Sequence, residues 1–173
     1  MKVVIAIFVT TLALASTVLC QKAPGGAAKV DPSKPVRDAF DRLVDGLKQV
    51  DSEKLMSVYE NSDRTLFFNN NGSVTMGWAQ MKKNRDESFA KTKNVTLETS
   101  GVRIELLSPT SAYVSFKWKQ RQEYDGKLET ASGRTTLVFK KIGKEWKAVH
   151  VHSSPDNPAP TRPVLDSERQ TSN

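Results

Sequence analysis

Cysteine is almost absent from this chain of 173 residues, which contains only Cys20. A single cysteine cannot form an intramolecular disulfide, so no covalent crosslink contributes to stability. The fold must therefore depend on a hydrophobic core. Roughly 150 residues remain beyond the first segment, enough to bury such a core in one domain.

Long hydrophobic runs are also lacking. The run from Val3 to Leu14 is shorter than the roughly 20 residues that a membrane-spanning helix needs, so we expect no membrane span. Lys2 precedes this run and small or polar residues follow it, which predicts a signal peptide over residues 1–20. Cleavage near Cys20 would export the protein to the periplasm or the exterior. Lipidation of Cys20 is the weaker alternative, because Leu19 stands where a small residue is usual.

Acidic residues are fewer than basic ones, 19 Asp and Glu against 26 Lys and Arg, for a net charge of +7. A basic balance can indicate an anionic partner such as nucleic acid. However, the basic stripe Lys117, Lys119 and Arg121 shares its strand face with only one aromatic residue, Tyr113. Binding of single-stranded nucleic acid normally needs several aromatic rings among the charges. We therefore expect no nucleic-acid partner and interpret the excess charge as favouring solubility.

The composition changes at both ends of the chain. Residues 21–34 are rich in Ala, Gly, Lys and Pro, which predicts a flexible leader, and residues 155–173 predict a disordered Pro-rich tail. The folded domain is therefore expected at residues 35–154. Asn71 and Asn94 lie in N-glycosylation acceptor patterns, which matter only in a eukaryotic source.

The N-terminal part of this domain predicts three helices. Apolar residues recur at helical spacing from Val36 to Val50, with Ser33 as a possible N-cap and Pro35 in the first turn. A short helix restarts at Asp51 or Ser52. The third helix runs from Trp78 to about Lys91 on the pattern Trp78, Met81, Arg85 and Phe89.

Strands make up the rest of the domain. Residues 65–68 and 73–76 predict a small hairpin, and residues 95–107, 111–124, 128–141 and 145–153 predict four long strands joined by short turns. Short turns imply antiparallel neighbours. The expected fold class is α+β, with the three helices packed on a curved, mainly antiparallel sheet. In the 111–124 strand, alternation places Val114, Phe116 and Trp118 on the buried face.

The last strand contains both histidines of the chain, His150 and His152. Because side chains alternate along a strand, both imidazoles are expected on the face that carries Trp146 and Ala148. A β-bulge within the strand would reverse this assignment for every residue after it.

The order of elements and the ending Trp146-Lys147-Ala148-Val149-His150-Val151-His152-Ser153 resemble the SnoaL-like branch of the NTF2-like superfamily. The stretch 95–154 is similar to the association domain of calcium/calmodulin-dependent protein kinase II, notably at Glu123-Tyr124-Asp125-Gly126 and Gly143-Lys144-Glu145-Trp146. The resemblance implies a cone-shaped fold with a pocket at its wide end. It also implies pairing through the sheet into a homodimer or larger ring.

Two departures from this superfamily bear on function. The catalytic positions of its ketosteroid isomerases match Leu43 and Phe67 or Phe68, which are apolar, so that isomerase chemistry is not expected. Arginines that line the pocket of the kinase association domain match Trp118, Leu137 and Ser153. The resemblance therefore implies a more apolar pocket, less suited to a carboxylate or phosphate.

Two sets of residues are candidates for a site. The ligand pocket would be lined by Tyr59, Phe67, Trp78, Met81, Trp118, His150 and His152, although the apolar members could equally be core. Acid–base candidates are His150, His152, Asp63 and Tyr59. The alternatives are structural histidines and a turn-forming Asp63. No third zinc ligand accompanies the histidines, so we expect neither a metal nor a cofactor.

Three functions remain open on these grounds. The favoured one is an exported, homo-oligomeric domain that binds a small, mostly apolar molecule and has no evident catalytic set. A pocket enzyme of the lyase, isomerase or hydrolase kind, using His150 or His152, is the second. A purely structural assembly module is the third. A shared fold does not decide among them.

Overall fold

The computed structural model describes residues 31–156. The predicted signal peptide, most of the predicted leader and nearly all of the predicted tail lie outside the described residues. Among the described helices, none combines the length and the apolar character needed to cross a membrane.

Two helices open the domain, as predicted. Helix α1 (Lys34–Gln49) follows Ser33 as its N-cap and has proline in its first turn, although the Ser33 hydroxyl makes no capping bond. Its buried side chains recur at helical spacing. Helix α2 (Ser52–Met56) begins after Asp51, whose Oδ1 accepts a hydrogen bond from the Lys54 amide at 2.8 Å. This bond satisfies one of the free amides of the first turn.

Gly46 allows these two helices to pack closely. A Cβ atom placed at Gly46 would lie 2.6 Å from the backbone nitrogen of Leu55 in α2. Any larger residue would push the helices apart. Leu55 and Met56 are thereby buried against α1, which makes the helical pair one wall of the core.

A hairpin and a third helix follow. Strands β1 (Leu66–Phe68) and β2 (Val74–Met76) pair antiparallel, and helix α3 spans Trp78–Phe89, two residues shorter than predicted. Strand β3 then begins at Thr92, earlier than expected. The predicted positions of these elements are otherwise confirmed.

Four long strands complete a six-stranded sheet of order β2-β1-β6-β5-β4-β3. They are β3 (Thr92–Ser108), β4 (Ser111–Tyr124), β5 (Lys127–Ile142) and β6 (Glu145–Pro155). All neighbours are antiparallel except β1 and β6, which run parallel. The α+β class with a mainly antiparallel sheet is confirmed. Strand β6 ends at Pro155, two residues beyond its predicted end.

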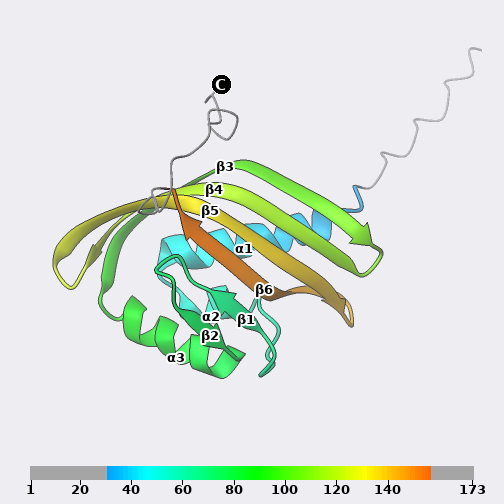
Figure 1. Ribbon diagram of the computed structural model, residues 1–173, viewed down its shortest axis with the longest axis horizontal. Helices are drawn as coiled ribbons and strands as arrows, with labels where there is room; N and C mark the ends of the chain where they lie inside the picture. The colour runs from blue at the N-terminus through cyan, green and yellow to red at the C-terminus, as the bar shows by residue number, and fades with distance from the viewer. Residues whose placement is uncertain (1–30, 157–173) are drawn as a thin grey trace, which may run out of the picture.

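The sheet is strongly curved. Strand β3 has three register shifts against β4, between Lys93 and Thr96, Ser100 and Arg103, and Leu106 and Ser108. Such bulges bend a strand and increase its twist. The long strands consequently arch over α1, while α2, α3, β1 and β2 lie below it (Figure 1).

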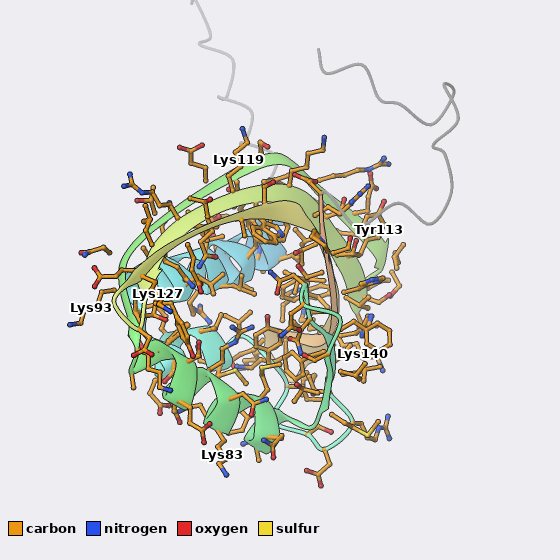
Figure 2. All side chains as sticks on the ribbon, turned by 60° about the vertical axis from the view of Figure 1, so that its left-hand side comes forward. Lys83, Lys93, Tyr113, Lys119, Lys127 and Lys140 are labelled. Atoms are coloured by element: carbon orange, nitrogen blue, oxygen red, sulfur yellow. The ribbon has the colours of Figure 1, made fainter. Side chains whose placement is uncertain are left out.

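The two faces of the sheet differ in composition. On β4, Val114, Phe116 and Trp118 are buried toward α1, as the alternation predicts, and Lys117 and Lys119 are exposed. Figure 2 shows Lys119, Tyr113 and Lys140 pointing away from the domain. The hydrophobic core therefore lies on the concave face, and the basic stripe lies on the convex face.

Candidate functional site

A cavity of about 230 Å³ remains in the concave side of the sheet, between the helices and strands β3 to β6. Its apolar wall is formed mainly by Leu43, Val44, Leu47, Leu55, Phe89, Val95, Leu97, Phe116, Leu137 and Val151. Its polar lining comprises Tyr59, Asn69, Asn70, Arg85, Ser88, Thr92, Gln120, Gln122, Thr135 and Ser153. The lining is therefore a mixture of polar and apolar side chains.

The polar residues continue into a second hollow of about 300 Å³ that adjoins the cavity. The two hollows share Asn70, Ser88, Trp118, Gln120 and Gln122. Gln120 Nε2 donates to Gln122 Oε1 at 2.5 Å, and Gln122 Nε2 donates to Glu129 Oε2 at 3.1 Å. This amide chain leads from the cavity toward the exposed end of β5.

Tyr59 forms part of the cavity lining, as predicted. It follows α2 in a short parallel bridge to Ala148, and its ring packs on Phe67 with centroids 5.0 Å apart. Burial raises the pKa of the Tyr59 hydroxyl to about 12. The phenol is therefore neutral at physiological pH, which makes it a hydrogen-bond donor and a poor general base.

Arg85 contributes the only basic side chain among the described residues that line the cavity. It lies on α3 between Met81 and Phe89 and is partly buried. Desolvation lowers the pKa of its guanidinium, and the nearby Tyr59 hydroxyl opposes this shift in part. Within residues 31–156, no carboxylate forms an ion pair with it. The cavity thus contains a desolvated cation without a protein counter-ion.

Trp118 contributes a second unsatisfied donor. Its side chain is only 8% exposed, and its Nε1 is the one buried side-chain polar atom within the described part of the chain that has no hydrogen-bond partner. The indole is held against Gly133, where a Cβ atom would lie 2.7 Å from Trp118 Cζ2. Leaving such a donor unpaired costs about 1–3 kcal/mol, so the position is costly unless something else accepts the bond.

The histidines are not where strand alternation placed them. Strand β6 has a bulge against β5: Phe139 pairs with Ala148, but Val138 pairs with His150, so Val149 has no opposite residue. The faces are reversed after Val149. Val151 and Ser153 consequently line the cavity, and neither His150 nor His152 belongs to its lining. The expectation that they share a face with Trp146 and Ala148 is wrong.

The bulge lies where β6 changes its neighbour. Before it, Ala148 exchanges backbone hydrogen bonds with Val58 and Glu60; after it, β6 pairs with β1. His150 Nδ1 lies 3.1 Å from the carbonyl oxygen of Leu66, to which it donates when protonated, and Phe68 contacts both imidazoles edge to face. These contacts fasten β1 to β6 on the outer face.

Four other predicted site residues also lie outside the cavity lining. Phe67 and Met81 are core residues, 2% and 3% exposed. Trp78 donates from Nε1 to the Met56 carbonyl at 2.9 Å and joins α3 to α2. Asp63 is exposed in the loop before β1. Of the predicted pocket residues, only Tyr59 and Trp118 line the cavity, and no histidine is available there for acid–base chemistry.

Sequence reasoning missed Arg85 as a site residue. Arg85 is part of the apolar pattern that predicts α3. It lies one turn from both Met81 and Phe89, on the face of the helix that this pattern predicts to be buried. A charged residue on a buried helix face is itself a signal for a functional site. The resemblance directed attention to Trp118, Leu137 and Ser153 instead. All three do line the cavity, but the cation comes from a helix rather than from these strands.

Metal chemistry gains no support from the described residues. No group of three His, Cys, Asp or Glu side chains among them is close enough together to hold an ion. His150 and His152 stand on the outer face without a third ligand beside them.

The curved sheet wrapped around α1, with a cavity on its concave side, defines the NTF2-like class of folds. The sequence profile of the SnoaL-like domain matches residues 36–158, and the chain belongs to this family. A comparison with curated proteins found no match.

Solved structures support the same fold. An NTF2-like superfamily protein from Salmonella enterica serovar Typhimurium has a TM-score of 0.67 at 22% identity, over 75% of this chain and 94% of its own. A protein assigned as a dehydratase of the NTF2-like family, from Streptomyces avermitilis, has a TM-score of 0.64 at 16% identity, over 73% of this chain and 98% of its own. A protein assigned to the calcium/calmodulin dependent protein kinase II association domain, from Xanthomonas campestris, has a TM-score of 0.60 at 18% identity, over 71% of this chain and 86% of its own. Such low identities establish the fold alone.

Proposed function

We propose that this protein binds a small molecule in the cavity between α1, α3 and the concave face of the sheet. The observation that carries the proposal is a cavity of about 230 Å³ whose lining contains Arg85, which has no ion-pair partner among the described residues, and Trp118, whose buried Nε1 has no hydrogen-bond partner. Protein interiors are close-packed and contain few voids larger than a water molecule. A void with unsatisfied donors is costly in the free protein and becomes favourable once a ligand accepts their bonds.

Binding, rather than acid–base catalysis, is what the lining supports. The phenol of Tyr59 is neutral, and neither His150 nor His152 lies in the cavity. The positions that match the isomerase catalytic residues, Leu43 and Phe67 or Phe68, are apolar. A pocket enzyme would have to use a group other than these candidates.

Export and self-association are part of the same proposal. The signal-peptide pattern over residues 1–20 supports export, and the exposed convex face of the sheet offers a surface for pairing. N-terminal sequencing of the protein from its own host tests the first, with Gln21 as the expected first residue. An intact N-terminus would contradict it.

Native mass spectrometry of that same preparation tests the binding function. We expect an oligomer that carries a stoichiometric small-molecule adduct, released on denaturation. A ligand-free oligomer whose thermal unfolding is also unchanged by small organic acids and their neutral analogues would contradict the proposal. That result would favour an assembly module.

A further inference from the structure

The charge balance inside the cavity suggests the chemical class of its ligand. Among the described residues that line it, Arg85 is the only side chain with a formal charge, and no aspartate or glutamate accompanies it. The nearest acidic group in the lining of the adjoining hollow, Glu129, is hydrogen-bonded to Gln122. The cavity therefore has an uncompensated positive charge.

The other cations of the same helix are arranged differently. Lys82, three residues before Arg85, forms ion pairs with Glu53 and Asp86, each at 2.7 Å. Lys83 is exposed and points away from the domain (Figure 2). Arg85 alone among these three cations is turned toward the cavity, where desolvation makes a lone charge expensive.

The remaining lining limits what kind of anion could fit. No lysine between residues 31 and 156 lines the cavity, so its single positive charge suits a single negative charge. The planar guanidinium matches a carboxylate through two parallel hydrogen bonds. The apolar wall, which includes Leu47, Phe89 and Phe116, would cover a hydrocarbon body. The Tyr59 hydroxyl can donate to a further oxygen atom.

From this arrangement we infer that the cavity binds a small monocarboxylate, with its carboxylate on Arg85 and its apolar body against the α1 side of the cavity. This inference rests on the proposed binding function and specifies its ligand class. A volume of about 230 Å³ is far more than one water molecule needs and admits a small organic molecule.

Matched pairs of probes test the inference on the full chain. Benzoate and benzamide, and hexanoate and hexanamide, have nearly equal shapes and differ in charge. Calorimetric titration of the wild-type protein should show each carboxylate binding at least about tenfold more tightly than its amide, the discrimination expected of a desolvated ion pair. Benzenesulfonate and phenyl phosphate serve as the competing anion classes and should bind more weakly than benzoate.

Variants then assign the preference to Arg85. Arg85→Gln should weaken carboxylate binding by at least about tenfold and leave amide affinity nearly unchanged. Arg85→Lys, which keeps the charge but not the planar fork, should retain part of the carboxylate preference. Lys83→Gln, which removes a cation from the outer side of the same helix, should change neither. A thermal scan of each variant verifies folding. If Arg85→Gln does not fold, the wild-type comparison and the loss of carboxylate affinity in Arg85→Lys test the inference.

Each other outcome has a definite meaning. Equal binding of carboxylates and amides would overturn the inference and leave the proposed binding function standing. A carboxylate preference that survives Arg85→Gln would also overturn it, since the general positive charge would then be responsible. Tighter binding of phenyl phosphate or benzenesulfonate would replace the carboxylate with that anion. Failure of every probe, with no adduct in the purified protein, would overturn both the inference and the proposed function.

Discussion

Positively charged side chains on the two sides of helix α3 have opposite electrostatic environments. On the outer side, Lys82 is held by Glu53 and Asp86, and these hydrogen bonds raise the pKa of its amine. On the inner side, Arg85 lines the cavity, and desolvation lowers the pKa of its guanidinium. In the outer arrangement, the Lys82 side chain is only 16% exposed, but both of its carboxylate partners reach solvent. The inner one destabilises the free protein and becomes useful only when an anion arrives.

The same contrast runs through the sheet. Lys117 and Lys119 face solvent on the convex side of β4, whereas Trp118, between them, has an unpaired Nε1 on the concave side. Charges on the convex side are hydrated and cost little. Unsatisfied donors on the concave side are concentrated around a single cavity, which is why that cavity, rather than the charged surface, is the candidate site.

The largest effect at neutral pH is expected from filling the space at Gly133, which holds the indole in the cavity wall. In Gly133→Ala, the new methyl group would meet Trp118 Cζ2, Trp118 Cε2 and the Ser154 carbonyl oxygen. Overpacking of this kind lowers the free energy of unfolding by about 1–3 kcal/mol. Urea denaturation followed by tryptophan fluorescence measures it, with Ser132→Ala as the neighbouring control. An unchanged midpoint would show that the indole is free to move.

Alkaline unfolding tests the inner position of Tyr59. Its pKa is about 12 when folded and 10.0 in the unfolded reference, so the unfolded state ionises first as the pH rises. Stability is then complete below pH 10 and declines as the pH rises from 10 to 12, by about 2–3 kcal/mol in all. The free energies of unfolding of the wild type and Tyr59→Phe should therefore diverge between pH 10 and pH 12. Parallel curves would mean that the hydroxyl is solvated.

Replacing the two cations of α3 in turn compares its two sides directly. Arg85→Met removes the desolvated charge and keeps an apolar side chain, so the free energy of unfolding should rise by about 1–2 kcal/mol. Lys82→Met breaks two ion pairs whose carboxylates reach solvent and should lower stability slightly. Thermal unfolding without ligand measures both. A large loss of stability in Arg85→Met would mean that Arg85 is structural and would weaken the contrast.

The smallest effect is expected on the outer face of β6. His150→Ala removes the contact with the Leu66 carbonyl and should cost about 1 kcal/mol of stability. Because His150 lies outside the cavity lining, benzoate affinity should be unchanged. Calorimetric titration of this variant with benzoate checks that the bulge at Val149 places His150 outside the cavity. A marked loss of benzoate affinity would show that the imidazole belongs to the site.

Strands β4 and β6 show how far alternation along a strand can be trusted. Strand β4 pairs with β5 without a register shift, so Val114, Phe116 and Trp118 face the core as predicted. Strand β6 carries one extra residue, Val149, and every assignment after it was reversed. Nothing in the local sequence marks Val149 as a bulge. It arises because β6 pairs first with residues 58–60 and then with β1.

Local patterns in the sequence were enough to determine the elements, their order, the α+β class and the inner face of β4, because helical spacing, strand alternation and turn residues act over a few neighbours. The tertiary structure alone decided where the cavity is, which way the histidines point and that Arg85 has no counter-ion in the part of the chain that the structure describes. Those properties depend on the register and burial of segments far apart in the chain, and a one-residue bulge is sufficient to change them.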